Sequence, residues 1–504
     1  MESRSKKSAR NIFTGFINKF LLMAFAFTTK TVFIRLLGAE YNGISGLYAN
    51  ILSILSLSEL GLGNVLNYSL YQVLKDHDEL KIRSIVQYFK KIYRIIAFGT
   101  CGIGLLLVPL LSFIVNTTLP QREVVLYYLL YLLNSVASYF VVYKTTVISA
   151  DQNAYISNIC ETATTFLMYV AQIVYLLRFH AFLGYLVIQV VCTVLKNIIL
   201  SCIADKKYPY LTVGKVDKAA FEKKSLLENI KATFLYKVSA VVLNNTDNIL
   251  ISIIVGTVAV GYYSNYYMVI TYIAAFVGVF ITGITASLGN LNAQKNANAS
   301  YEMFMMLSLV FNFIATVVAC CLLNCFQAFI PIWIGKEYVM PISWVAVIII
   351  NNYLNEIMSP IWMFRETMGM FKQVQFLMPV TAALNLMFSV VLGLKFGVPG
   401  ILIATALSKI VSQYWYEPRI LFREQFHMHE SVFFLAQARQ ILTSIAAVVA
   451  SYILCQWMPS SFVGLIERVF VSGMVALLFV WVVNCKSLAW QELYKRYVCK
   501  IIKR

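Results

Sequence analysis

Charged side chains are scarce in this sequence of 504 residues. Lys, Arg, Asp and Glu together make up 13% of the chain, whereas apolar residues make up 60%. Soluble globular domains carry about 25% charged residues. The mean hydropathy of +0.73 is also far above that of a soluble domain. The composition therefore excludes a soluble globular protein and indicates an integral membrane protein.

The motifs of common metal and nucleotide sites are also missing. The ten cysteines form no Cys-x-x-Cys, and His427 and His429 alone offer too few ligands for a zinc site. No Gly-x-x-x-x-Gly-Lys-Ser/Thr motif occurs, which argues against ATP hydrolysis. No loop is long enough to form a separate catalytic domain. We therefore expect no metal, no cofactor and no enzymatic activity.

What the chain does contain is a series of apolar segments of about 20 residues, the length that crosses a bilayer as a helix. They predict an all-α integral membrane protein with about fourteen transmembrane helices. The predicted spans are 11–37, 43–70, 92–115, 124–148, 155–177, 183–204, 230–255, 262–288, 303–334, 341–364, 374–394, 398–421, 441–457 and 462–484.

Basic residues are concentrated in alternate loops between these segments. Clusters such as Lys206, Lys207 and Lys215 recur on one side, whereas the loops of the other side offer only isolated residues such as Arg178. Because basic loops stay in the cytoplasm, both termini are predicted to be cytoplasmic, and the basic first ten residues are read as a retained lead, not a signal peptide. This topology also accounts for most of the net charge of +18, without a nucleic-acid partner.

The two halves of the chain repeat one another. A spacing of 218 residues relates Gly38 to Gly256, Gly43 to Gly261, Tyr48 to Tyr266, and Lys19 to Lys237. Since the first and seventh spans run in the same direction, the repeats are parallel and indicate a transporter. We expect an N-terminal lobe of six helices at 1–204, a basic cytoplasmic linker at 205–229, a second six-helix lobe at 230–424, and two added helices with a basic tail at 437–504.

Several cations lie inside the predicted spans, where a charged side chain costs about 2.5 to 3.5 kcal/mol to insert. Lys19 and Lys30 are eleven residues apart and share nearly one face of the first helix. Lys237 is the repeat mate of Lys19. We expect Lys19, Lys30 and Lys237 to contact an anionic substrate, with Arg35 as a weaker candidate. The alternative for each is that the side chain reaches back to a lipid headgroup.

Acidic residues in the spans are fewer. Asp247 and Glu59 are candidates for ion coupling or, alternatively, for pairing with neighbouring lysines. Because cations outnumber acids, a cavity lined by these residues favours an anion. At 4 Å and an effective dielectric near 20, two unit charges attract by about 4 kcal/mol, so a diphosphate can offset the cost of inserting lysines. Further charges within the spans are Lys144, Lys196, Lys409, Glu161 and Glu356.

Tyrosines cluster at the start of the eighth predicted span. They have two interpretations, anchoring at the membrane interface or stacking on sugar rings at the mouth of a cavity. The residues concerned are Tyr262, Tyr263, Tyr266 and Tyr267.

Two groups of residues carry a resemblance to a known family. One is Thr246-Asp247-Asn248 followed by Gly256 and the run from Gly261 to Tyr266, and the other is Trp415-Tyr416-Glu417-Pro418. Together with the span count and the duplication, they resemble the polysaccharide-transporter branch of the multidrug/oligosaccharidyl-lipid/polysaccharide exporter superfamily, over nearly the whole chain.

The resemblance implies a flippase of the bacterial cytoplasmic membrane. Such a protein moves an undecaprenyl-diphosphate-linked oligosaccharide across the membrane by alternating access, for the assembly of capsule, O-antigen or exopolysaccharide. It implies membrane lipids and, further, a polysaccharide polymerase and other assembly proteins as partners. The last two helices are expected to help form a groove for the lipid tail. Carried over onto this chain, the basic first-helix positions are Lys19 and Lys30, with Lys237 in the second lobe.

Other interpretations remain open from the sequence. A cation-coupled drug or small-molecule antiporter of the same superfamily would need acids to dominate the cavity, and here they are outnumbered. A membrane-embedded glycosyltransferase or polymerase would need a large catalytic loop. A scaffold in a polysaccharide-assembly complex would show no transport by itself.

Overall fold

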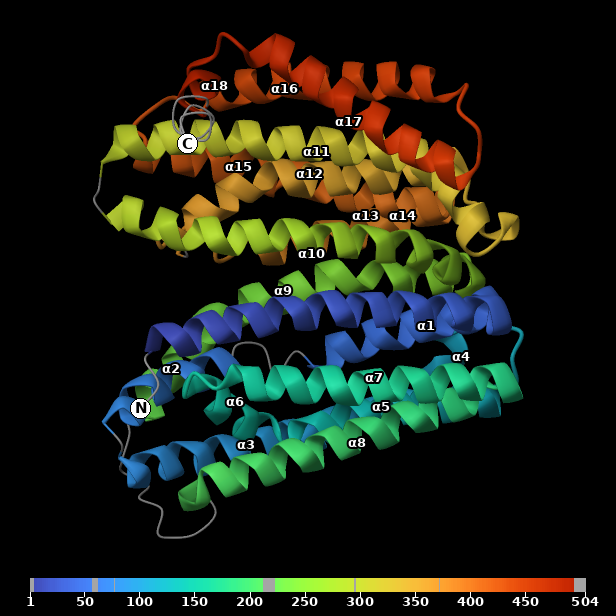
Figure 1. Cartoon of the computed structure of the whole chain (residues 1–504), viewed down its shortest axis with the longest axis vertical. Helices are drawn as coiled ribbons and strands as arrows, with labels where there is room; N and C mark the ends of the chain where they lie inside the picture. Colours follow the sequence, from blue (N-terminus) through green and yellow to red (C-terminus); the bar gives the residue numbers. More distant parts are fainter. Residues whose placement is uncertain are drawn as a thin grey trace. The chain divides into compact units, whose positions relative to one another are not determined.

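The computed structural model consists of α-helices joined by short connections (Figure 1). It describes residues 4–56, 62–76, 78–211, 223–293, 296–370 and 372–493, and no β-strand occurs among them. Helices satisfy their own backbone hydrogen bonds, which a chain surrounded by lipid requires. The chain divides into two compact units, Met1–Gly261 and Tyr262–Arg504.

The first unit contains the helices that carry Lys19, Lys30, Arg35, Lys237 and Asp247, the candidate site residues that the structure describes. Its α3 begins at a helix cap, because the Asp78 carboxylate accepts a hydrogen bond of 3.0 Å from the Lys81 backbone N–H. The elements are α1 (Arg4–Leu55), α2 (Leu62–Lys75), α3 (Glu79–Leu106), η2 (Val108–Leu110), α4 (Leu111–Ile114), α5 (Gln121–Tyr139), α6 (Val142–Ala150), α7 (Ala154–Phe179), α8 (Phe182–Lys207), η3 (Pro209–Leu211) and α9 (Lys223–Ile254).

Helix α1 contains a sharp break at Gly38. The backbone there has φ 86° and ψ −174°, so α1 consists of two helical segments that match the first predicted span and the start of the second. Gly256, the repeat mate of Gly38, separates α9 from α10 (Thr257–Ala293) with φ 127°. Glycine adopts positive φ without the steric penalty of a Cβ. The duplicated turn therefore has a left-handed glycine in both copies.

Five residues after these turns, Gly43 and Gly261 form a close helix crossing, here called the glycine crossing. A Cβ added to Gly43 would lie 1.9 Å from the Thr257 carbonyl oxygen, and one added to Gly261 would lie 2.0 Å from the Ala39 carbonyl oxygen. The Asn42 side-chain amide donates a hydrogen bond of 2.8 Å to the Gly261 carbonyl. Since Ala39 and Thr257 are also repeat mates, the contact is reciprocal.

Aromatic side chains fill the first unit beside this crossing. Tyr48 is fully buried, donates a hydrogen bond of 2.8 Å to the Val124 carbonyl, and packs edge-on against Tyr128 and Tyr131. At the other end of the unit a second core joins α2, α3 and α6. It contains Leu66, Val86, Phe89, Tyr93 and Val147, each fully buried.

The second unit is built around α11, which packs against α12, α16 and α17. Its core is an aromatic cluster in which Phe304 contacts Phe364, Phe422 and Phe426. Besides most of α10, its elements are α11 (Ala297–Trp333), η4 (Lys336–Tyr338), α12 (Ile342–Thr367), α13 (Leu377–Phe396), α14 (Val398–Val411), α15 (Gln413–Ile420), the π-helical η5 (Leu421–Gln425), α16 (Ser431–Cys455), α17 (Phe462–Asn484) and α18 (Leu488–Leu493).

An ion pair stabilises the connection from η5 to α16. Arg423 donates two hydrogen bonds of 2.7 Å to the Glu430 carboxylate, from Nε and Nη2. This bidentate bond lowers the pKa of Glu430 to about 2. The carboxylate is therefore ionised throughout the physiological range, and α16 begins immediately after it.

Within the described residues, nine helices are long and apolar enough to cross a membrane, or ten if the bent pair α5 and α6, with 44° between them, is one span. The predicted number of about fourteen is not reached by this criterion. Two reasons are visible in the second unit: α14 ends at Val411 after 14 residues, and α12 carries Asn351, Asn352, Asn355 and Glu356. Predicted span 462–484 coincides with α17.

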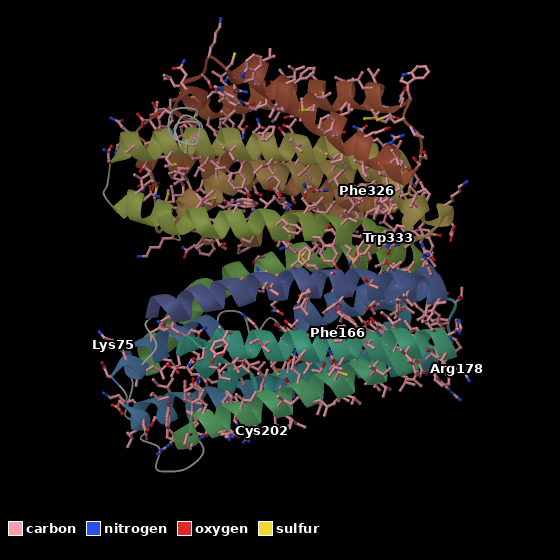
Figure 2. All side chains as sticks on the ribbon, in the orientation of Figure 1. Lys75, Phe166, Arg178, Cys202, Phe326 and Trp333 are labelled. Atoms are coloured by element: carbon pink, nitrogen blue, oxygen red, sulfur yellow. The ribbon has the colours of Figure 1, made fainter. Side chains whose placement is uncertain are left out.

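The ends of the helices in the first unit carry the charges on which the topology prediction depends. Figure 2 shows Lys75 and Arg178 at opposite ends of this unit. Both side chains are exposed. The loops that the sequence assigned to different sides of the membrane are thus separated by the length of the helices.

Candidate functional site

Lys30 is a cation in the apolar part of α1 with no counter-ion among the residues that the structure describes. It lies eight residues before the break at Gly38, and its side chain is partly buried. The Lys30 Nζ lies 5.1 Å from the centroid of the Phe33 ring. In the described part of the chain the lysine makes neither an ion pair nor a hydrogen bond. The ammonium group therefore keeps its hydrogen-bond donors for another partner.

The ring beneath Lys30 belongs to an aromatic cluster. Phe33 is 1% exposed, and its ring centroid lies 4.9 Å from that of Tyr185 and 5.5 Å from that of Phe182. Phe182 in turn contacts Tyr41 and Tyr127. A cation over an aromatic face gains about 0.5 to 2 kcal/mol, less than an ion pair in the same place. The cluster fixes the position of Lys30 but does not neutralise it.

Lys19 lies on the same helix, but in a different environment. Its side chain is exposed, whereas its neighbour Asn18 is buried and donates a hydrogen bond of 3.3 Å to Glu161 on α7. Thr162 donates to the Asn18 side-chain oxygen. These contacts border an apolar cavity of about 460 Å³ between α1 and α7, lined by Ile17, Asn18, Phe25, Asn158, Ile159, Thr162, Ala163 and Phe166.

Lys19 and Lys30 cannot share one small anion. The helix is unbroken between them, so their eleven residues correspond to about 16 Å along the axis. No hydrogen bond or ion pair between described residues connects the two side chains. They mark two positions along α1 instead of one site.

The remaining candidates are arranged on α1 and α9, which pack against each other. Lys237 is partly buried on α9. Arg35 is exposed and Asp247 is 9% exposed, and each of them interacts with another residue, so neither is a free charge. Glu59 lies outside the described residues. The structure thus places Lys19, Lys30, Arg35, Lys237 and Asp247 on two packed helices, without joining them into one polar cluster.

The repeat gives the positions around Asp247 a counterpart in α1. Thr29 is the repeat mate of Asp247 and Asn248 is that of Lys30. Thr29 is 1% exposed, and among the described residues neither its hydroxyl nor the buried Asn248 side-chain oxygen has a hydrogen-bond partner. Neutral polar residues are common in apolar spans. Thr29 and Asn248 differ from the others in lying on α1 and α9, two helices that pack against each other.

The second unit contains an acid without a partner. Glu356 is 5% exposed in the interior of α12, and in the described part of the chain its carboxyl group makes no hydrogen bond or ion pair. The adjacent Asn355 accepts a hydrogen bond of 2.9 Å from Lys409 Nζ on α14. Sequence reasoning noticed Glu356 and Lys409 as charges within spans but gave neither a role.

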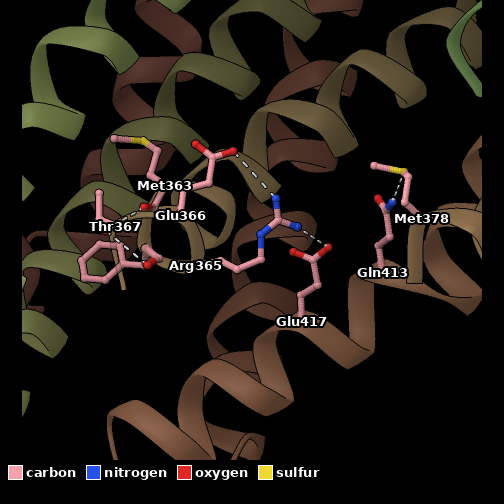
Figure 3. A network of polar contacts seen from close by, with 8 residues as sticks. Met363, Arg365, Glu366, Thr367, Met378, Gln413 and Glu417 are labelled. Carbon is pink, nitrogen blue, oxygen red and sulfur yellow. Dashed lines mark hydrogen bonds and ion pairs between the residues drawn. The ribbon is translucent and has the colours of Figure 1, made fainter. Parts of the chain in front are cut away.

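Other charged residues in or next to the predicted spans form ion pairs with one another (Figure 3). Arg365 Nη1 and Glu417 Oε1 are 3.0 Å apart, with side chains 6% and 2% exposed, and they connect α12 to α15. Glu366 lies 3.8 Å from the same guanidinium. In the first unit, Lys144 and Asp205 form an ion pair of 2.6 Å between α6 and α8. These pairs connect helices. Each of their charges already has a counter-ion, so we assign none of them to a substrate.

One of the tyrosines at the start of α10, Tyr266, has a structural role. Tyr266 is fully buried, packs on Phe326, and accepts a hydrogen bond of 2.9 Å from the Met340 backbone N–H. Tyr263 stacks on Tyr267, which is 45% exposed. Tyr266 therefore belongs to the core of the second unit, where Figure 2 labels Phe326.

The arrangement of the helices is similar to that of solved membrane-transporter structures, although the sequences share little identity. No protein-family model matches the chain, and no curated protein matches it in sequence. A solved structure of the lipid II flippase MurJ in an inward closed conformation is similar to it with a TM-score of 0.71 and 13% identity, over 94% of this chain and 98% of that one.

Two structures of MATE transporters are similar as well. An inward-facing multidrug resistance MATE family transporter of the MOP superfamily has a TM-score of 0.61 and 15% identity, over 79% of this chain and 94% of that one. A MATE transporter of Vibrio cholerae has a TM-score of 0.56 and 12% identity, over 84% and 99%. At these identities the likeness establishes the fold alone.

Proposed function

We propose that this protein is a flippase that moves a lipid-linked oligosaccharide across the bacterial cytoplasmic membrane. The observation that carries the proposal is Lys30, a cation in the apolar part of α1 with no counter-ion among the described residues. Such a charge is costly unless a ligand meets it. An undecaprenyl-diphosphate carrier would bring a compact double anion to this ammonium group and an apolar tail to the surrounding lipid.

The fold supports this proposal, since the MurJ structure covered by almost the whole chain is that of a lipid II flippase. Transport would proceed by alternating access and draw on an ion gradient, the membrane potential or the concentration difference of the substrate. No catalytic step is required of the chain. The product would serve capsule, O-antigen or exopolysaccharide assembly, with a polymerase and other assembly proteins as partners.

A second function has its own observation. Glu356 is a buried carboxyl group without a partner in the described part of the second unit, and MATE transporters share the fold. A cation-coupled antiporter would use such an acid to bind the coupling ion or a cationic substrate. We regard it as the alternative because Lys30 in the first unit would gain nothing from a cationic cargo.

The two functions are separated by reconstituting the protein into liposomes. A fluorescent polyprenyl-diphosphate oligosaccharide is followed across the bilayer with and without an imposed potential, and a cationic dye is measured in parallel. We expect the wild-type protein to move the glycolipid. Dye export without glycolipid movement would contradict the flippase and support the alternative.

Lys30→Ala should strongly reduce glycolipid transport, and Lys30→Arg should retain part of it, because arginine keeps the charge that meets the diphosphate. Loss of a charge-assisted hydrogen bond of about 1.5 to 3 kcal/mol corresponds to a decrease of roughly ten- to hundred-fold. Lys81→Ala, which removes an exposed cation at the end of α3, is the matched control. Wild-type transport by a folded Lys30→Ala protein would refute the assignment of the site.

A further inference from the structure

The second unit contains a cavity of about 350 Å³ that the proposed transport function does not use. It lies between α11, α16, α17 and α18, at the end of these helices that the loop charges predict to be cytoplasmic. Phe304, Leu309 and Phe433, all buried, form its apolar part. A water molecule occupies about 30 Å³ in the liquid, so the cavity can hold a group much larger than one water.

The Gln437 side-chain amide in this cavity has no hydrogen-bond partner among the described residues. Gln437 on α16 is 6% exposed and lines the cavity, and its side chain makes no hydrogen bond within the described part of the chain. Leaving a buried polar group unpaired costs about 1 to 3 kcal/mol. The Ser308 hydroxyl on α11 lines the same space and is also unbonded there. Both groups are therefore available to a ligand.

A guanidinium group lies beside the amide. Arg439 lines the cavity, and its side chain makes one hydrogen bond to the described residues, a long one of 3.4 Å from Nη2 to the Asn484 side-chain oxygen. That oxygen already accepts a hydrogen bond of 2.6 Å from Gln440. An arginine has five N–H donors. Most donors of Arg439 thus remain for an anion, and a phosphate group suits their planar geometry.

Two carboxylates line the same cavity, which restricts the ligand further. Glu302 on α11 and Glu492 on α18 both interact with other residues, but a carboxylate accepts about four hydrogen bonds and retains capacity for more. A purely anionic ligand would have these two acids close to its charge. A ligand with a phosphate for Arg439 and an ammonium group for the acids meets both signs.

Apolar side chains at the border indicate that the ligand is part of a lipid. Leu488 lines the cavity and is 81% exposed, and Leu435 and Leu442 on α16 are 72% and 67% exposed. Exposed leucines on a transmembrane helix face the acyl chains of the bilayer. A headgroup in the cavity would leave its acyl chains along this surface of α16.

We propose that the cavity binds the headgroup of a phosphatidylethanolamine-type lipid from the adjacent leaflet. Its phosphodiester accepts hydrogen bonds from Arg439, Gln437 and Ser308, and its ammonium group lies toward Glu302 and Glu492. The site holds a lipid of the membrane, separate from the cargo assigned to α1. Its test therefore does not depend on transport.

The test uses the full chain in detergent, titrated with short-chain phosphatidylethanolamine, phosphatidylglycerol and phosphatidylcholine, and with inorganic phosphate. Native mass spectrometry counts bound lipid, and thermal unfolding follows the stabilisation. We expect saturable binding of phosphatidylethanolamine, at least ten-fold tighter than of the other two lipids, and no stabilisation by inorganic phosphate. Equal binding of the three lipids, or equal stabilisation by phosphate alone, would overturn the proposal.

Gln437→Leu should raise the unfolding temperature without lipid and lower the affinity for lipid. Without lipid, the variant should unfold at a higher temperature than the wild type, because an unpaired buried amide is replaced by an apolar side chain of similar size. With lipid, it should lose about ten-fold in affinity for phosphatidylethanolamine. Arg439→Gln, at an exposed position, should weaken binding similarly, so the proposal stays testable if Gln437→Leu fails to fold.

Gln456→Leu is the matched control, since it makes the same change at an exposed position at the other end of α16. It should change neither the unfolding temperature nor lipid binding. If Gln437→Leu and Arg439→Gln both bind phosphatidylethanolamine as the wild type does, this cavity is not the site.

Discussion

Arg365 and Glu417 illustrate how single residues determine the stability of the second unit. Their ion pair of 3.0 Å is buried between α12 and α15, and the second Glu417 oxygen has no hydrogen-bond partner in the part of the chain that the structure describes (Figure 3). The low polarity around the pair strengthens its attraction and also raises the cost of losing either member. Loss of one member should therefore destabilise the protein more than replacement of both members by apolar residues.

Arg365→Met should destabilise the protein by about 3 to 5 kcal/mol, because it leaves the Glu417 carboxylate buried without its cation. The double variant Arg365→Met/Glu417→Leu should recover most of this loss, since apolar residues of similar volume replace both charges. Unfolding of the purified protein in mild detergent, followed by circular dichroism, measures the difference. A single variant as stable as the wild type would contradict this role for the pair.

At the residue scale, the sequence identifies charges but not their partners. Lys30 and Lys144 are equally conspicuous within apolar spans, yet Lys144 is paired with Asp205 at 2.6 Å and Lys30 has no counter-ion in the described part of the chain. Gln437 escaped notice because a neutral amide in a span is ordinary. Only the packing of four helices makes it an unpaired group beside a cavity.

At the scale of elements, the repeated glycines were visible in the sequence and their geometry was not. The constant spacing selected Gly38 with Gly256 and Gly43 with Gly261, but their contact follows only from the crossing of two helices. Breaks within spans were also unpredictable. The bend between α5 and α6 and the interruption at Ser412 occur inside continuous apolar segments.

Gly43→Ala should destabilise the protein by about 1 to 3 kcal/mol or more, because its Cβ would lie 1.9 Å from the Thr257 carbonyl oxygen and backbone must move. Gly102→Ala is the matched control. Gly102 lies within α3 with nothing within 4 Å of an added Cβ, so alanine there should stabilise by up to about 1 kcal/mol.

Thermal unfolding of the purified variants should show shifts of opposite sign. Gly261→Ala should behave like Gly43→Ala, because the contact is reciprocal. Similar unfolding temperatures for Gly43→Ala and Gly102→Ala would indicate that the glycine crossing is not required.

At the scale of the whole molecule, composition predicted the helical membrane fold, while the division into compact units needed the structure. The six-helix lobe predicted at 1–204 is a unit of the sequence repeat and stays a prediction, whereas the first unit defined by packing extends to Gly261. It includes α9 because α9 packs against α1 and because the Ser252 hydroxyl on α9 donates to the Ile114 carbonyl at 2.8 Å. The boundary of a sequence repeat can therefore differ from the boundary of a compact unit.

The predicted topology can be tested with single cysteines in a background whose ten native cysteines are replaced. Lys75→Cys and Arg178→Cys lie at opposite ends of the first unit, and both positions are exposed (Figure 2). Because basic loops remain inside, a membrane-impermeant thiol reagent applied to intact cells should label Arg178→Cys and not Lys75→Cys. Permeabilised cells should label both. The reverse pattern would place the termini on the outer side.

The glycine crossing has a consequence for how the protein is made. Gly43 contacts a segment that leaves the ribosome 218 residues later, which at about 5 to 20 residues per second takes roughly 10 to 40 s. During that interval the face of α1 around Gly43 lacks its partner segment. The biogenesis of the first unit therefore depends on the order of synthesis and on whatever occupies that surface in the meantime.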